Sequence, residues 1–102
     1  MKTIYCPCRD MKEAKKIGNA LIKKHLIACA NIFPETISMY RWKGKIENAK
    51  ESIIFCKTAD TKCKAAMNLI KKMHSYKVPA ILAFRVDDVN REYSQWMQKV
   101  MC

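Results

Sequence analysis

Apolar residues recur along this chain at two different spacings, and the spacing predicts where helices and strands lie. Residues 10–26 are predicted to form a helix, because apolar residues repeat there at intervals of three and four. These positions are Ala14, Ile17, Leu21, Ile22 and Leu26. Asp10 and Glu13 have the spacing of a capping box at its start. Gly18 costs a helix about 1 kcal/mol relative to alanine, so we expect another element to pack closely against it.

Two further helices are predicted from the same spacing. Asp60 and Thr61 offer an N-cap for a helix that continues to about residue 74. Its apolar face consists of Cys63, Ala66, Met67, Ile70 and Met73. Asn90 can cap a last helix, whose apolar stripe consists of Tyr93, Trp96, Met97, Val100 and Met101.

The remaining apolar runs have the β-rich composition of strands. Residues 2–6 form a short run that Pro7 closes, and residues 80–86 form another. Between them, residues 28–58 predict a long hairpin that turns at Lys43-Gly44, where glycine can supply a positive φ. Pro34 interrupts its first half, and since proline cannot donate to a ladder we expect a bulge, a break or an edge there.

The predicted order of elements is βαββαβ followed by a C-terminal helix. This order is that of the ferredoxin-like α+β fold, an antiparallel sheet with two helices on one face. A chain of 102 residues is the size of one domain, and we expect a single domain over residues 1–102.

The cysteine and charge content restricts the environment and the partners. None of the six cysteines forms a C-x-x-C or zinc-finger spacing, and Cys29 and Cys56 lie in apolar strand-like runs, which indicates free thiols. The net charge of +11 favours acidic partners, but the lysines are spread over polar helix faces that are typical of solvated surface. No run approaches the ~20 apolar residues of a membrane span. We expect a cytoplasmic protein with no membrane association.

Several segments carry a more specific pattern. They are Ala28-Cys29-Ala30-Asn31-Ile32, Ser38-x-Tyr40-x-Trp42-x-Gly44-x-Ile46, Glu51, Lys57-Thr58, His74-x-Tyr76-x-Val78-Pro79-x-Ile81 and Tyr93-x-x-Trp96. In this order and at these spacings they resemble the motif series of the CutA divalent-cation tolerance proteins, over nearly the whole chain. The resemblance implies a ferredoxin-like homotrimer that acts in tolerance of divalent cations, copper above all, or in the response to metal ions.

The resemblance also implies roles for individual residues. The long hairpin is expected to add to the sheet of a neighbouring subunit, where Tyr40 and Trp42 bury their rings. Cys6 and His74 match family positions that are linked with copper. Met73 stands where some relatives have a second histidine, and it or Cys8 is expected to complete a ligand set that crosses the subunit interface.

Three alternatives to a metal-binding protein remain open from the sequence. The family resembles the PII signalling proteins, so the chain is alternatively a trimeric small-ligand-binding protein with no physiological metal. Glu51, Lys57 and Tyr76 would then line a cleft between subunits. The family block usually carries proline and glutamate where this chain has Ser75 and Ala80, so part of such a cleft is missing.

Nucleic acid binding and catalysis are the other two alternatives, and the sequence disfavours both. RNA-recognition domains share the βαββαβ order, but residues 51–57 have no glycine and one aromatic residue where their third-strand motif needs a glycine followed by several aromatics. We therefore expect no specific nucleic acid binding. Only two glycines are present, and no nucleophile–base motif or phosphate loop appears. We expect the protein not to be an enzyme.

Overall fold

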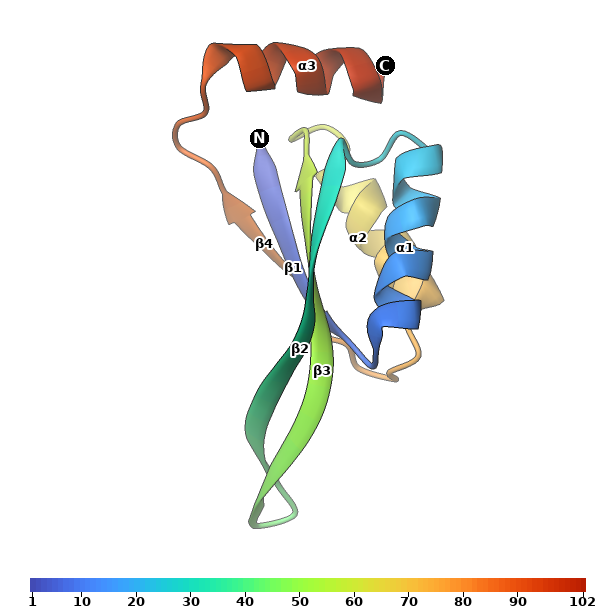
Figure 1. The fold of residues 1–102 in the computed structure, drawn as a ribbon, viewed down its shortest axis with the longest axis vertical. Coiled ribbons are helices and arrows are strands. Elements are labelled where there is room, and N and C mark those ends of the chain that lie inside the picture. Colours follow the sequence, from blue (N-terminus) through green and yellow to red (C-terminus); the bar gives the residue numbers. More distant parts are fainter.

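The chain folds into one antiparallel sheet with two helices on one face and a third helix across its end (Figure 1). The computed structural model describes residues 1–102. Its elements are β1 (Lys2–Cys8), α1 (Met11–Lys23), β2 (Cys29–Trp42), β3 (Lys45–Thr58), α2 (Cys63–Met73), β4 (Leu82–Arg85) and α3 (Arg91–Met101). The strand order β2-β3-β1-β4 is that of the ferredoxin-like fold, which confirms the predicted fold class. None of the three helices is long and apolar enough to cross a membrane.

Several predicted boundaries were wrong by a few residues, each for a local reason. β1 continues through Pro7 to Cys8, because β4 begins opposite Tyr5 and leaves Pro7 with a partner strand on one side only. α1 ends at Lys23 instead of Leu26. His25 takes a left-handed φ of 59°, and the Leu26 N–H bonds to the Leu21 carbonyl in a helix-ending motif.

The predicted cap of α2 was also wrong. Lys62 occupies the N-cap position, and no side chain bonds to the first turn of the helix. The Asp60 carboxylate instead lies 2.8 Å from the N-terminal ammonium of Met1. The hydrogen bond from the ammonium lowers the pKa of Asp60, and the positive charge of the ammonium lowers it further. Asn90 does sit at the N-cap of α3, but its side chain makes no capping hydrogen bond.

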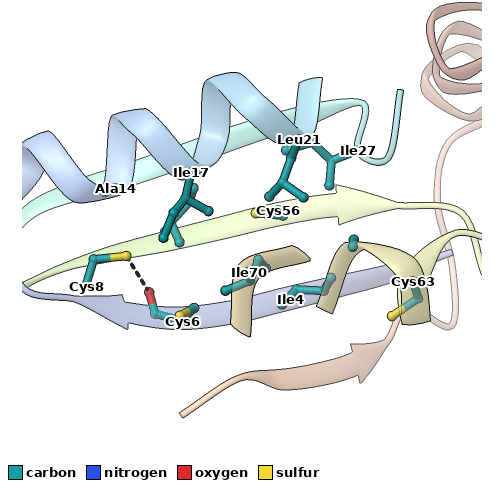
Figure 2. Packing of buried hydrophobic residues seen from close by; sticks show 12 residues of the cluster. Ile4, Cys6, Cys8, Ala14, Ile17, Leu21, Ile27, Cys56, Cys63 and Ile70 are labelled. Carbon is teal, nitrogen blue, oxygen red and sulfur yellow. Dashed lines mark hydrogen bonds between the residues drawn. The ribbon is translucent and has the colours of Figure 1, made fainter. Parts of the chain in front are cut away.

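The hydrophobic core lies between the sheet and the pair α1 and α2 (Figure 2). Ile4 and Ile54 from the sheet, Leu21 from α1 and Ile70 from α2 are all fully buried. Gly18 lies over Ile54, and a Cβ atom at residue 18 would be 3.3 Å from the Cδ1 atom of Ile54. The close approach expected at this glycine is therefore confirmed.

The hairpin of β2 and β3 extends well beyond the body of the molecule (Figure 1). Its pairing continues from Thr36 opposite Glu51 to Trp42 opposite Lys45, and the chain measures 47 × 25 × 22 Å. The register shifts between Phe33 and Thr36, which confirms the irregularity expected at Pro34. Lys43 and Gly44 form the turn with φ values of 50° and 78°, as a two-residue hairpin turn requires.

Candidate metal centre

Two thiols from β1 lie side by side under the helices. Cys6 and Cys8 are two residues apart on one strand, so that their side chains share a face, and both are fully buried in the core. The Cys8 thiol lies 3.8 Å from the Cys6 carbonyl oxygen, to which it donates (Figure 2). The ligand atoms of Cys6, Cys8 and His74 all lie within 4.8 Å of one another. A strand and the end of a helix thus bring three soft donor groups together.

His74 reaches this point because it is the C-cap of α2. Its backbone leaves the helix in an extended conformation, and only 8% of the residue is exposed. The ring atom Nε2 lies 2.8 Å from the carbonyl oxygen of Pro7, the residue between the two cysteines. The other ring nitrogen, Nδ1, accepts a hydrogen bond of 3.1 Å from the backbone N–H of Tyr76.

These two contacts determine where the ring proton lies. A backbone N–H can only donate, so Nδ1 must present its lone pair to Tyr76. A carbonyl oxygen can only accept, so the proton must lie on Nε2 and point to Pro7. His74 is therefore neutral, with its proton on Nε2.

Glu13 lies next to the imidazole, in the first turn of α1. One carboxylate oxygen, Oε1, accepts from the Arg9 N–H and the other, Oε2, from the Ser75 N–H, each at 2.9 Å. Oε1 also lies 3.9 Å from Nδ1 of His74. Burial opposes ionisation of this carboxyl, but the hydrogen bonds from Arg9 and Ser75 outweigh it and lower the pKa of Glu13. The site therefore includes a buried carboxylate that is ionised at neutral pH.

Two thiols of the core, Cys6 and Cys56, are shielded from ionisation by their surroundings. Hydrogen bonding with Cys8, followed by burial, raises the pKa of Cys6. Burial raises the pKa of the nearby Cys56 to about 12. Both groups are thiols at neutral pH, so a ligand that needs thiolates must displace their protons.

The ligand residues predicted from the sequence meet in a different way than expected. Cys6, Cys8 and His74 converge within one chain, so these three residues meet without a second subunit, and a ligand set that crosses a subunit interface stays a prediction. Met73 packs against the hydrophobic core. Glu13 was predicted only as part of a capping box, and the structure shows a modified form of that motif. The Glu13 N–H donates to the Asp10 side chain, but the Glu13 carboxylate accepts from the N–H of Arg9 instead of that of Asp10. No pattern in the sequence indicates that this carboxylate meets a histidine sixty residues later.

Two of the three predicted cleft residues are in contact. The Tyr76 hydroxyl donates to a Glu51 carboxylate oxygen at 2.6 Å, and the Ser38 hydroxyl donates to the other oxygen. Burial, and then the bond to Glu51, raises the pKa of Tyr76. Lys57 lies elsewhere in the chain, with its ammonium 3.8 Å from the Cys29 sulfur and bonded to Asn31. A cleft that unites all three residues stays a prediction about an assembly.

Comparison with known proteins agrees with this architecture. Residues 2–100 match the family model of the CutA1 divalent ion tolerance protein. The chain is 41% identical over 98 residues to the divalent-cation tolerance protein CutA of Thermococcus kodakarensis, covering 96% of this chain and 93% of that protein.

Solved structures give the same result. The divalent ion tolerance protein CutA1 of Ehrlichia chaffeensis superposes with a TM-score of 0.97 at 33% identity, covering 99% of this chain and 94% of that one. The periplasmic divalent cation tolerance protein CutA of Archaeoglobus fulgidus superposes with a TM-score of 0.93 at 34% identity, covering 99% of each chain.

Proposed function

This chain belongs to the CutA1 divalent ion tolerance family, and we propose that it binds copper through Cys6, Cys8 and His74. The observation that carries the proposal is the convergence of two thiols and an imidazole, whose ligand atoms lie within 4.8 Å of one another. The proposed role is binding, with no catalytic step.

The chemistry of these donors fits a soft metal ion. Thiolate and imidazole suit copper, whereas magnesium and calcium prefer sets of oxygen ligands. The nearby carboxylate of Glu13 is not one of the three converging groups, so the donor set consists of two sulfur atoms and one nitrogen atom. Copper bound here would be held by sulfur and nitrogen inside a core that excludes water.

The environment of the thiols makes binding depend on pH. Both thiols must lose their protons and the imidazole must offer a lone pair, so protons compete with the metal for every ligand. The raised pKa of Cys6 makes this competition stronger than for an exposed thiol. We expect affinity for copper to fall steadily as the pH is lowered from 7 to 5.

A titration of reduced protein with Cu(I), against a competing chelator, tests the site. Cys6→Ser, Cys8→Ser and His74→Ala should each weaken binding by at least the roughly 10–100-fold that loss of an outer-shell group causes. Cys56→Ser is the matched control, because Cys56 is equally buried in the same core but is not one of the three converging residues. If Cys6→Ser and His74→Ala bind copper like wild type, the surplus thiols bind it incidentally and the assignment is wrong.

We also propose that the protein is a homotrimer in which the hairpin of each subunit packs on a neighbour. Support comes from the exposed rings of Tyr40 and Trp42, which are 47% and 59% accessible in the single chain. Isolated two-stranded hairpins are marginally stable in water, and their free edges invite pairing. Packing on a neighbouring subunit would stabilise the hairpin and pair its free edges.

A small-ligand-binding trimer of the PII type, with no physiological metal, is the second candidate. One observation favours it, a hollow of about 340 Å³ that charged residues of both signs line, Arg9 and Lys50 together with Asp10, Glu35 and Glu51. Titrating copper against a panel of small metabolites on reduced protein discriminates the candidates. Binding of a metabolite that Lys50→Ala weakens, without any copper site, would favour the second.

The proposed compartment is the cytoplasm. All six cysteines are free, although Cys6 and Cys8 have adjacent side chains. Free thiols persist in the reducing environment of the cytosol. Because the relative from Archaeoglobus fulgidus is a periplasmic protein, fractionation of cells that express the chain is the direct test.

A further inference from the structure

The imidazole of His74 is held in a state that cannot bind a metal ion, and its neighbours indicate how it is released. We propose that Glu13 is a positioning residue for the metal site, which accepts a hydrogen bond from Nδ1 of His74 when Nε2 becomes the ligand atom. This inference rests on the proposed copper site and assigns an effect on affinity to Glu13, which is not one of the three ligand residues.

The ring has no free lone pair as the structure stands. Nδ1 accepts from the Tyr76 N–H at 3.1 Å, and Nε2 donates its proton to the Pro7 carbonyl at 2.8 Å. A metal ligand must offer an unprotonated nitrogen. One of the two hydrogen bonds must therefore break before His74 can join Cys6 and Cys8.

Nε2 is the nitrogen in position to bind. It contacts the carbonyl of Pro7, the residue between the two cysteines, so this edge of the ring faces the segment that carries both thiols. Nδ1 is on the edge of the ring that faces Glu13 and Tyr76. Binding through Nε2 needs the opposite tautomer from the one observed, with the proton on Nδ1.

A proton on Nδ1 requires an acceptor, and Glu13 is the group that can serve. The Tyr76 N–H is itself a donor and would oppose the Nδ1 proton. Oε1 of Glu13 lies 3.9 Å from Nδ1, about 1 Å longer than a charge-assisted hydrogen bond. A small rotation of the ring toward the carboxylate closes this gap, which gives the arrangement in which a carboxylate orients a metal-binding histidine.

Glu13 is prepared for this role by its surroundings. Hydrogen bonds from the Arg9 and Ser75 N–H groups hold the carboxylate in place, and only 8% of the residue is exposed. A carboxylate offers about four lone-pair sites, so Glu13 can accept a hydrogen bond from the Nδ1–H group in addition to the two backbone hydrogen bonds. The ring stays neutral throughout, since one proton leaves Nε2 and one arrives on Nδ1, while the two thiols release their protons to solvent.

The change of tautomer reaches the hairpin through Tyr76. When Nδ1 becomes a donor, the Tyr76 N–H loses its acceptor. The hydroxyl of the same residue is bonded to Glu51 of β3, which in turn is bonded to Ser38 of β2. Loading of the metal site is therefore expected to perturb the base of the hairpin, where Glu51 lies.

The tautomer of His74 can be observed directly by long-range ¹H–¹⁵N NMR of the reduced protein, with and without one equivalent of Cu(I). The chain contains only two histidines, so His25 serves as an internal reference in every spectrum. We expect the proton on Nε2 in the free protein and on Nδ1 in the loaded one, with a shift of the Tyr76 amide resonance. Loaded protein that keeps the proton on Nε2 would overturn this inference alone, and wild type that binds no copper would overturn the proposed function with it.

A pair of variants separates positioning from helix capping. Glu13→Gln should weaken Cu(I) binding by about 10–100-fold and leave no stable Nδ1–H state in the loaded protein. Asp10→Ala is the matched control, because Asp10 caps the same helix through the Glu13 N–H and is not bonded to His74. It should reduce stability while the affinity and the tautomer stay as in wild type. Equal losses of affinity in the two variants would assign Glu13 to capping only. If Glu13→Gln does not fold, the wild-type spectra still show whether Nδ1 of His74 carries the proton in the loaded protein, and a proton on Nε2 overturns the inference.

Discussion

The same two strands, β2 and β3, build two regions with opposite properties. In the body, residues of β3 such as Ile54 and Cys56 are fully buried under α1 and α2. In the arm, which we define as residues 36–50, apolar side chains lie on both faces of the hairpin and are open to solvent. Ile37, Met39, Trp42 and Ile46 are between 58% and 69% exposed. Strand pairing thus orders both regions, but burial of side chains stabilises only the body.

The difference supports the proposal that the arm packs on a second copy of the chain. Scattered apolar residues are normal on a protein surface, but a contiguous group of large ones indicates an interface. The arm is joined to the body by a short polar network, in which Glu51 bonds to Ser38 within the hairpin and to Tyr76 beyond α2. The body is a folded core, whereas the arm exposes apolar side chains that the proposed homotrimer would bury.

The largest expected effect comes from a cavity in the body. Ile54→Ala removes a fully buried side chain that packs on Gly18, and should lower the free energy of unfolding by about 2–5 kcal/mol. Chemical denaturation at one fixed protein concentration measures this, since stability of an oligomer depends on concentration. Ile54→Val is the control and should cost about 0.5–1.5 kcal/mol. A loss below 1 kcal/mol for Ile54→Ala would mean that the body is not the main source of stability.

In the arm, Trp42→Ala should change assembly far more than it changes the single chain. The ring is 59% exposed, so its removal costs an isolated subunit little, whereas at a central interface position the loss is commonly 2 kcal/mol or more. Light scattering over a dilution series should show a wild-type trimer that dissociates at higher concentration in the variant. Lys71→Ala is the control, because Lys71 is exposed on α2, outside the arm. Wild type that is a stable monomer at micromolar concentration would end the trimer proposal.

The body and the turn of the arm were predictable because local chemistry determines them. Three-and-four spacing located the helices, Gly18 indicated close packing, and Lys43-Gly44 with Pro34 placed the turn and the irregularity. Boundaries were less predictable, because they depend on tertiary partners. β1 runs through Pro7 only because β4 does not extend to the position opposite Pro7. Asp60 contacts the N-terminal ammonium instead of capping α2.

The candidate site was predictable as a set of residues but not as an arrangement. Cys6 and His74 were singled out by family resemblance, and the shared face of Cys6 and Cys8 follows from strand geometry. That His74 meets them within one chain depends on the crossing of α2 over β1, which no spacing encodes. The neighbouring carboxylate of Glu13 escaped notice for the same reason.

The charges of the two regions also differ, and this gives the smallest expected effect. The arm carries one exposed carboxylate, Glu47, among four cations, whereas all charged residues exposed on α1 and α2 are lysines, because Glu13, the one carboxylate on these helices, is buried. Such a surface attracts any polyanion weakly, with typical nonspecific Kd values of about 10⁻⁴–10⁻⁶ M at physiological salt. Substituting glutamate for Lys71 and Lys72 should weaken binding to duplex DNA more than the same substitutions at Lys43 and Lys45. Both effects should vanish as the salt concentration rises. Fluorescence anisotropy with two unrelated duplexes measures this, and binding that prefers one sequence at physiological salt would show that the helical layer is a specific nucleic-acid site instead of solvated surface.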